Sequence, residues 1–506
     1  MKPLVVAISL AFVAATLGCG PDRGAGTDAG AVVGVGVGVT GGTTGGAGVG
    51  GGAGAGGATT AMPERYPCDD LFGQDHITTC EIEIGAAEWA ALESDMVDRR
   101  AREAAVPPQD YHPYHALQAL RVGGDSIANA MIRLKGQSSW LHAIDGWQPG
   151  MPIPKMQFVI AFDQIDTEAR FHGLRKIELD MPHNDPSMLR QRLALSFLRD
   201  DLALPAQCAN SGRLVVNGTY YGLYTNLERP DKSFLKRVFP GQSGGDLWDA
   251  GWTLETNEEV ADHPRQCLFW GLSLGNCGAS PPAIIDADAL AAVSDMDASM
   301  IEWAGEAMVT DADGYWGGRH NWYLYDHPER GFIWIPHDLD ATLTWIARND
   351  VDPVFWWEIR TLSSGGTDPH FLGVVTNPDW LPRYVDAVRR ARRAYDVATM
   401  LARLDRATAQ IADAVAADTH KPFTAAAQTA AAATIRSNLA ARAAFIDGWL
   451  ACIDGGGTDG DGDGAPWCRD CNDNDASRAQ GQSEICGDGV DQDCNSLVDD
   501  GCAPTM

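Results

Sequence analysis

The alternation of hydrophobic and polar positions indicates β-strands in the first half of the folded part of the chain. Residues 130–135 and 156–162 alternate or run apolar over lengths typical of strands. Residues 213–224 repeat the pattern around Asn217-Gly218, a dipeptide that favours a two-residue hairpin turn. We therefore predict a β-sheet that contains this hairpin.

Helical spacing of apolar residues replaces this alternation elsewhere. Residues 186–200 carry apolar side chains at helical spacing after Asp185, a residue type suited to an N-cap. The stretch from about residue 378 to 450 is rich in Ala, Arg and Leu with few helix breakers, and predicts two or three amphipathic helices packed on the rest. The pattern indicates the α+β class, with one large folded unit over residues 62–452.

The first residues of the chain have the layout of an export signal. Lys2 precedes an apolar run over residues 4–17, which is typical of a secretory signal peptide and too short to span a bilayer. The end of this run and Cys19 resemble a bacterial lipobox, with Thr16 where that motif prefers Leu. We expect lipidation of Cys19 and membrane attachment in a bacterial cell envelope, at the outer membrane or surface. The alternative is a plain signal peptide whose Cys is incidental.

Residues 20–61 consist almost entirely of Gly, Ala, Val and Thr. This composition has too little bulky apolar surface to offset the entropy of ordering the backbone. The segment is expected to be a flexible tether with a reach on the order of 35 Å, which would hold a folded domain clear of a membrane.

Composition narrows the classes of function. With 68 Asp and Glu against 38 Lys and Arg, the formal net charge is -30, which excludes nucleic-acid binding through a basic surface. A share of 45% hydrophobic residues is ordinary for a globular protein. The chain contains no His-Glu-x-x-His, so one large class of metal-dependent hydrolases lacks its signature here.

The twelve cysteines of an exported chain indicate disulfides ahead of a structural zinc site. If one is lipidated, one of the remaining eleven is unpaired or pairs outside the chain. Cys68 with Cys80, and Cys267 with Cys277, are near enough in sequence to close short loops. Sequence spacing alone leaves the connectivity open.

A set of six segments carries a recognisable pattern, namely residues 132–140, 155–163, 171–176, 184–190, 217–228 and 335–340. In this order they resemble the CotH family, the spore-coat-protein-H-like atypical secreted kinases. The similarity covers roughly residues 80–345, with helices beyond. It implies a divergent, two-lobed protein-kinase-like domain that binds ATP with Mg²⁺ or Mn²⁺ and phosphorylates Ser or Thr of surface or secreted proteins.

Two acidic residues follow the strand-like stretch 331–335. Asp338 and Asp340 are two positions apart, so on an extended segment both side chains would point to the same side. Mg²⁺ is typically held by one or two carboxylates together with phosphate oxygens. Asp338 is therefore the leading candidate metal ligand and Asp340 the second. The alternative is a solvated turn at the end of a strand.

A loop interrupted by glycines, residues 311–321, leads into the aromatic stretch 322–325. By the resemblance, Asp313 matches the loop Asp of the family, which would orient the substrate hydroxyl or accept its proton. Asn321 likewise matches an amide that would ligate the metal. Without the resemblance, a loop of this composition is more simply a plain turn.

The phosphates of a nucleotide need cations and hydrogen-bond donors. Lys135 and the residues after it, including Ser138, would offer a charge, backbone N–H groups and hydroxyls. Lys155 opens an apolar strand in a matching segment, which ranks it above Lys135 as the fixed positive charge. Glu228 ends the hairpin strand and either pairs with a cation at the cleft or caps the strand. These four residues are the candidate cofactor-binding set.

Residues 453–506 hold thirteen acidic residues, two Arg and almost no bulky apolar residues, and so cannot build an ordinary core. Oxygen-bearing side chains at alternating positions followed by Gly are typical of the first half of a Ca²⁺ loop. The segment resembles the Asp/Cys-rich metal-binding repeat of bacterial surface proteins; the alternative is a solvated acidic tail with disulfides. The candidate ligands are Asp459, Asp461, Asp463 and Asp470, the last at position twelve of its loop, and Asp491, Asp493 and Asn495.

The sequence thus predicts a secreted, lipid-anchored kinase of surface proteins. The alternative is a kinase-like surface binding or adhesion protein that has lost turnover and carries a calcium-stabilised tail. Fold resemblance does not transfer activity, so phosphate transfer has to be measured to separate the two.

Overall fold

The computed structural model describes most of the chain between Cys68 and Cys502. Cys19, the tether and the pair Cys267 and Cys277 lie outside the described residues, so the predictions made for them stay predictions. The described residues are 68, 70–106, 109, 112–136, 138–181, 183–250, 253–257, 263, 265, 269, 284–318, 320–343, 349–355 and 368–502.

A large sheet of eight strands occupies the first half of the described chain, where the alternating pattern predicts strands. The strand order is β1-β7-β8-β6-β5-β4-β2-β3. Because β1 pairs with β7 on one side and with β2 on the other, all strands except β3 close into a barrel-like sheet. The strands are β1 (Thr78–Ile84), β2 (His115–Val122), β3 (Asp125–Ile127), β4 (Met131–Leu134), β5 (Phe158–Ala161), β6 (Lys176–Asp180), β7 (Ala209–Val216) and β8 (Thr219–Glu228).

The hairpin predicted at Asn217-Gly218 joins β7 to β8 and is confirmed. Both turn residues have positive φ, 50° and 79°, which the favoured two-residue hairpin turn requires. Two helices, α1 (Ala86–Glu103) and α2 (Ser138–Ala143), pack together because the Trp140 indole donates to the Met96 carbonyl at 2.8 Å. Their apolar side chains join those of the barrel in one buried cluster.

A second sheet of four strands, in the order β10-β9-β11-β12, lies in the later part of the chain. The antiparallel pair β11–β12 contains both the aromatic stretch and the strand that precedes the acidic pair. The elements of this region are α4 (Lys232–Val238), β9 (Leu247–Asp249), β10 (Thr253–Leu254), α6 (Ala287–Ala291), α7 (Met296–Val309), α8 (Tyr315–Gly318), β11 (Trp322–His327) and β12 (Gly331–Pro336).

The helix predicted over residues 186–200 begins four residues later than predicted. It is α3 (Arg190–Ser196), continued by a π-helical turn, η2 (Phe197–Asp201). The carboxylate of Asp185 accepts hydrogen bonds from three of the following backbone N–H groups and closes an irregular turn ahead of the helix. The side chain expected as an N-cap therefore stabilises that turn.

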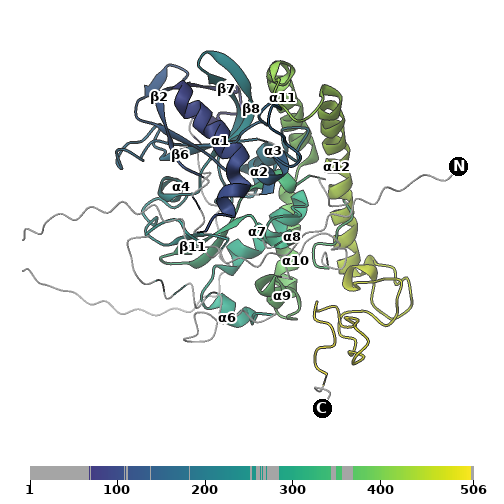
Figure 1. The fold of residues 1–506 in the computed structure, drawn as a ribbon. Coiled ribbons are helices and arrows are strands. Elements are labelled where there is room, and N and C mark those ends of the chain that lie inside the picture. The colour runs from purple at the N-terminus through teal and green to yellow at the C-terminus, as the bar shows by residue number, and fades with distance from the viewer. Residues whose placement is uncertain are drawn as a thin grey trace, which may run out of the picture. The chain divides into compact units, whose positions relative to one another are not determined.

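Three long helices follow, as residues 378–450 predict. Figure 1 shows α11 and α12 lying side by side. Asp396 and Thr424 cap them, since each side chain accepts from a backbone N–H three residues on. The helices of this region are α9 (Pro369–Val375), α10 (Leu381–Ala394), α11 (Val397–Ala417) and α12 (Ala425–Ala451).

The α+β class and the C-terminal helices are thus confirmed. The closed, barrel-like sheet does not by itself establish the two-lobed kinase arrangement, which stays a prediction. Within the described part of the chain, no helix combines the length and apolar character needed to cross a bilayer.

Disulfides are confirmed, but the pairing suggested for Cys68 and Cys80 is wrong. Cys68 pairs with Cys208, 140 residues away, while Cys80 on β1 is buried with a free thiol. The reason is the strand order, which brings the start of β7 beside the segment that precedes β1. Three further disulfides hold the tail, Cys452–Cys468, Cys471–Cys494 and Cys486–Cys502. Disulfides of this number indicate an exported protein.

Candidate active site

Asp338 follows the end of β12 in a left-handed conformation, with φ 49° and ψ 60°. The next residues form a 3-10 turn, η3 (Leu339–Ala341), so the extended geometry predicted for the acidic pair is wrong. Burial and repulsion from Asp180 and Asp313, opposed by Lys135, raise the pKa of Asp338 to about 7. Burial and the neighbouring carboxylates also raise the pKa of Asp340 well above its usual value. The pair therefore belongs to a larger group of carboxylates.

The side chains of Asp313 and Asn321 contact one another. The Asn321 side-chain amide donates to an Asp313 carboxylate oxygen at 2.9 Å. Asn321 has φ 48°, and its carbonyl accepts from the backbone N–H of His337, the neighbour of Asp338. Burial raises the pKa of Asp313. The glycine-interrupted loop thus places its acid next to the acidic pair after β12.

Lys135 is the cation of this group. Its ammonium nitrogen lies 2.7 Å from a Glu178 oxygen and 3.0 Å from an Asp180 oxygen. Burial opposes its charge, but Asp180, Glu178 and Asp338 outweigh this effect and raise the pKa of Lys135. The Arg229 guanidinium donates to the second Glu178 oxygen at 2.6 Å. Both cations are therefore held in fixed positions beside the carboxylates.

Asp180, Asp313, Asp338 and Asp340 form a buried acidic cluster around Lys135, in which the charges of the carboxylates act on one another. Such crowding of like charges is relieved when a divalent cation binds. The sequence pattern did not single out Asp180 and Glu178. Both residues lie in β6, directly after the family-like stretch 171–176. The acidic residues that follow this stretch are the signal in the sequence that could have identified them.

Two buried carboxylates behind the loop hold its backbone. Asp311 accepts from the N–H groups of Asp313 and Gly314 at 3.2 and 3.0 Å. Glu306 on α7 accepts from the next two N–H groups, those of Tyr315 and Trp316, at 3.2 and 2.6 Å. Sequence analysis missed both residues, since nothing in their spacing distinguishes them from ordinary helix and turn positions. They fix the loop that presents Asp313.

Lys155 lines the same small pocket as Lys135, but its charge is engaged elsewhere. Its ammonium donates to the Asp418 carboxylate and to the Leu223 carbonyl, each at 2.6 Å, and lies 4.5 Å from the Tyr224 ring centre. Burial lowers the pKa of Lys155 to about 8. The pocket is lined by Met96, Leu134, Lys135, Trp140, Ala143, Lys155, Gln157 and Met181.

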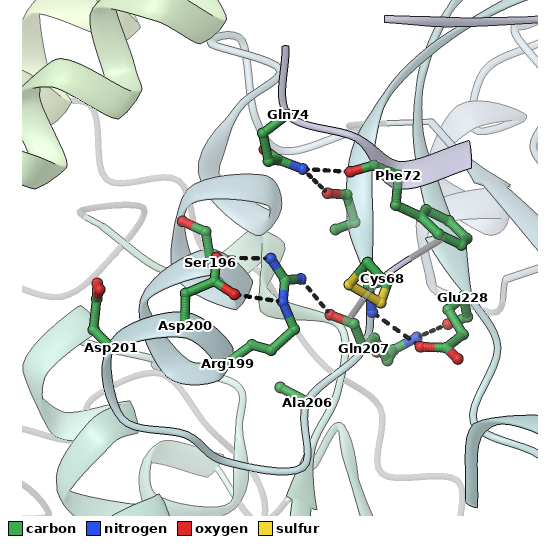
Figure 2. A network of polar contacts seen from close by, with 12 residues as sticks. Cys68, Phe72, Gln74, Ser196, Arg199, Asp200, Asp201, Ala206, Gln207 and Glu228 are labelled. Carbon is green, nitrogen blue, oxygen red and sulfur yellow. Dashed lines mark hydrogen bonds and ion pairs between the residues drawn. A yellow bond between two sulfur atoms is a disulfide. The ribbon is translucent and has the colours of Figure 1, made fainter. Parts of the chain in front are cut away.

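Glu228 also lies in an ion pair of its own. Its carboxylate binds the Arg237 guanidinium and accepts from the Cys208 N–H at 3.1 Å. Figure 2 shows Gln207 beside it, with the Gln207 amide directed at the Glu228 carbonyl. The Gln207 oxygen lies 2.8 Å from the His337 ring, so this network supports the residue next to Asp338. Ser138 begins α2, and its side chain lies outside the described residues.

The tail brings most of its predicted ligands into two groups. Ligand atoms of Asp459, Asp461 and Asp463 lie within 4.8 Å of one another, and so do those of Glu484, Asp493 and Asp500. The sequence pattern did not identify Glu484 and Asp500, because a Ca²⁺ loop is recognised by ligands at alternating positions and these two residues lie outside such a run. Asn495 donates to Asp493 and Asp500, and Asp491 accepts from the backbone N–H groups of Asn495 and Ser496.

A third tail group, Asp470 with Cys471 and Cys494, does not offer thiolates. The two sulfurs are joined in a disulfide, so Asp470 alone remains as a ligand there.

Comparison with known proteins agrees with the resemblance seen in the sequence. Residues 132–266 match the family model of the CotH kinase protein. The chain is also 27% identical over 210 residues to the inner spore coat protein H of Bacillus subtilis (strain 168). This similarity covers 37% of the chain and 54% of the relative, so the chain spans about half the length of the curated relative it matches. The family-model match contains Lys135 and Asp180 and ends before Asp313.

A second family model, "Putative metal-binding motif" (Cu-binding MopE), matches residues 470–500. The matched segment includes the group formed by Glu484, Asp493 and Asp500, of which the last lies at its end. The resemblance of the tail to metal-binding repeats is therefore confirmed for this segment.

Proposed function

We propose that this chain is an exported protein kinase that transfers the γ-phosphate of ATP, with Mg²⁺ or Mn²⁺, to Ser or Thr of surface or secreted proteins. The observation that carries the proposal is the buried acidic cluster of Asp180, Asp313 and Asp338 beside Lys135. They derive from the barrel, from the loop before β11 and from the turn after β12. Carboxylates, an amide and a fixed cation are the groups that phosphoryl transfer needs.

The divalent ion would be held by Asp338 and Asn321, with Asp340 and Asp180 as further oxygen ligands. These side chains fit an ion of this kind, because Mg²⁺ takes oxygen ligands from few carboxylates and completes its shell with water and phosphate oxygens. When bound, the ion supplies positive charge that stabilises the transferred phosphoryl group.

Lys135 and Asp313 complete the set of residues that would act in phosphoryl transfer. An ammonium group has three N–H donors, and Glu178 and Asp180 occupy two of those of Lys135. The third would donate to a phosphate oxygen, while the pair with Glu178 holds the side chain in place. Asp313, oriented by Asn321, would accept the proton of the substrate hydroxyl as its oxygen attacks the γ-phosphorus and ADP leaves.

The test uses the full-length protein, ATP labelled in its γ-phosphate, Mg²⁺ or Mn²⁺, and casein as a Ser-containing probe alongside autophosphorylation. We expect Asp338→Asn to lower transfer by about 100-fold or more, because it removes a metal-binding charge. Asp379→Asn, at an exposed position outside the acidic cluster, is the control and should transfer as the wild type does.

Equal transfer by Asp338→Asn and the wild type would reject this site. Thermal stabilisation of the wild type by ATP and metal without any transfer would instead favour the kinase-like binding or adhesion protein. If the folded protein does not bind ATP together with the metal, both hypotheses are rejected: the active kinase and the kinase-like protein that binds nucleotide without transfer.

We also propose that the protein is lipid-anchored at Cys19 in a bacterial envelope. The proposal rests on the apolar run and the lipobox-like residues that precede Cys19. Mass spectrometry of the N-terminal peptide from the membrane fraction tests it: a diacylated cysteine is expected, and an unmodified N-terminus would contradict the anchor.

A further inference from the structure

Three carboxylates of the tail converge in a loop that precedes the segment matched by the metal-binding family. Asp459, Asp461 and Asp463 each place a ligand oxygen within 4.8 Å of the others. Exposed acidic groups often cluster without an ion, so this arrangement alone does not define a site. The fourth residue of the loop provides the second observation.

Asp470 is only 5% exposed, and its Oδ2 atom is buried with no hydrogen-bond donor. One oxygen each of Asp461 and Asp463 is likewise buried and without a donor. An unpaired buried carboxylate oxygen is unfavourable, because it loses water and gains no partner. Asp470 belongs to the same loop, at position twelve counted from Asp459. A bound cation would satisfy all of these oxygens together.

The available donors select the class of cation. Cys468 and Cys471, which flank Asp470 in sequence, are both in disulfides and cannot act as thiolate ligands. Oxygen donors alone favour a hard cation, and a loop with several carboxylates suits the large, flexible coordination sphere of Ca²⁺. Soft or borderline metals such as copper and zinc prefer nitrogen and sulfur donors, whereas the acidic side chains of this loop offer only oxygen.

The same loop contacts the C-terminal helices. In the sequence, Trp467 lies between the clustered acids and Asp470. Its ring packs on Phe445 of α12 with 5.8 Å between ring centres. Its backbone N–H donates to the Thr458 carbonyl at 3.0 Å, which closes the loop. The disulfide Cys452–Cys468 ties the following residue to the end of α12. An ion in the loop would therefore hold a segment that packs on the helical core.

We propose that residues 459–470 bind one Ca²⁺ ion through Asp459, Asp461, Asp463 and Asp470, and that this ion fastens the Trp467 segment to α12 and stabilises the C-terminal helices. This site lies upstream of the matched metal-binding segment, apart from Asp470 itself. It is independent of nucleotide binding and of phosphate transfer.

The experiment uses the full-length protein, treated with EDTA, dialysed into chelator-free buffer and titrated with CaCl₂ by calorimetry. We expect Asp470→Asn to weaken binding at one site by about tenfold or more, because one of four charged ligands is lost. The matched variant Asp475→Asn, at an exposed position of the tail outside the acidic groups, should leave Ca²⁺ binding unchanged. Asp459→Asn, at an exposed position, repeats the test at a residue whose replacement leaves the buried part of the loop intact.

The link to α12 is tested by melting temperature and by fluorescence. Ca²⁺ should raise the melting temperature of the wild type and of Asp475→Asn, and raise it less in Asp470→Asn and Asp459→Asn. The Ca²⁺-dependent change in tryptophan emission should be smaller in Trp467→Phe than in the wild type. Unchanged Ca²⁺ binding in both Asp470→Asn and Asp459→Asn would overturn the site. Binding without any rise in melting temperature would overturn the coupling to the helices, and binding of Cu²⁺ alone would overturn the choice of ion.

Discussion

The side-chain environment of the two candidate lysines distinguishes them more clearly than their position in the sequence. Lys155 opens an apolar strand, yet its ammonium is enclosed by Asp418 and the Leu223 carbonyl. Lys135 pairs instead with Glu178 and Asp180, in the acidic cluster. A lysine that is to bind phosphate must have an N–H group near the carboxylates that are proposed to hold the metal, and Lys135 fits this requirement better.

We therefore expect Lys135→Ala to weaken ATP binding about 10- to 100-fold, since hydrogen bonds to charged groups contribute about 1.5–3 kcal/mol. Isothermal calorimetry with ATP and Mg²⁺ measures this change. Lys176→Ala, on β6 but outside the ion pairs of the acidic cluster, is the control and should bind ATP as the wild type does. Equal affinities of the two variants would contradict the role assigned to Lys135.

Glu302 is a second residue whose environment has a measurable consequence. It is fully buried on α7, and its carboxylate oxygens have no donor apart from the neighbouring carboxyl group of Glu306. Burial, with repulsion from Asp311 and Asp368, raises the pKa of Glu302 to about 8 from its usual 4.5. The folded protein therefore binds this proton more tightly than the unfolded chain does.

Between about pH 4.5 and pH 8 the folded state holds more protons at Glu302 than the unfolded state, so this group destabilises the fold progressively as the pH rises. Glu302→Gln removes the titration while keeping the shape. We expect the melting temperature of the variant, relative to the wild type, to increase from pH 5 to pH 8. Glu329→Gln, exposed in the β11–β12 turn, should show no such trend. A pH-independent difference for Glu302→Gln would argue against the shift.

The C-terminal end of α11 contacts both the barrel and the connection to α12. Asp418, the residue after this helix, accepts from the ammonium of Lys155 and from the Leu223 N–H of β8 at 2.9 Å. It also accepts from the N–H groups of His420 and Lys421, which begin the connection to α12. One buried carboxylate thus orients both a strand and a helix connection.

Asp418→Asn should cost about 3–5 kcal/mol of unfolding free energy, because it leaves the buried Lys155 charge without its partner. Urea unfolding monitored by circular dichroism measures the loss. Asp413→Asn, at an exposed position of the same helix, should change the stability by less than about 0.5 kcal/mol. If the two variants unfold at the same urea concentration, the pair does not join these elements as described.

Disulfides and strand order act together in the barrel. Cys68 reaches Cys208 at the start of β7, and the N–H of Cys208 donates to Glu228 at the end of β8. The neighbouring Gln207 bridges Glu228 and His337. Glu228, which the sequence assigned to cofactor binding, thus supports the turn that carries Asp338 through Gln207 and His337.

At the scale of the whole molecule, the acidic cluster around Lys135 combines segments that are far apart in the chain. Lys135 follows β4 and Asp180 ends β6. Asp313 lies in the loop between α7 and α8, and Asp338 follows β12 of the second sheet. The net charge of -30 adds a constraint, because carboxylates gathered in the acidic cluster and in the tail repel one another unless cations bind. Divalent ions at both places are consistent with this charge and with an exported protein.

Local patterns in the sequence were sufficient for part of this description. The hairpin at Asn217-Gly218, the C-terminal helices, the acidic pair near Asp338 and the acidic tail with its disulfides follow from periodicity, turn chemistry and composition, which act over a few residues. The pairing of Asp313 with Asn321 required the family resemblance in addition, because the interval between them is an ordinary loop.

Only the tertiary structure decided which lysine meets the carboxylates, that Asp180 and Glu178 pair with Lys135, and that Cys68 pairs with Cys208. Each of these contacts joins residues between about 40 and 140 positions apart. They depend on how the strands are ordered and on where the sheet closes through β1. Strand order is set by the combined burial of many side chains, and the periodicity of a single segment carries no information about it.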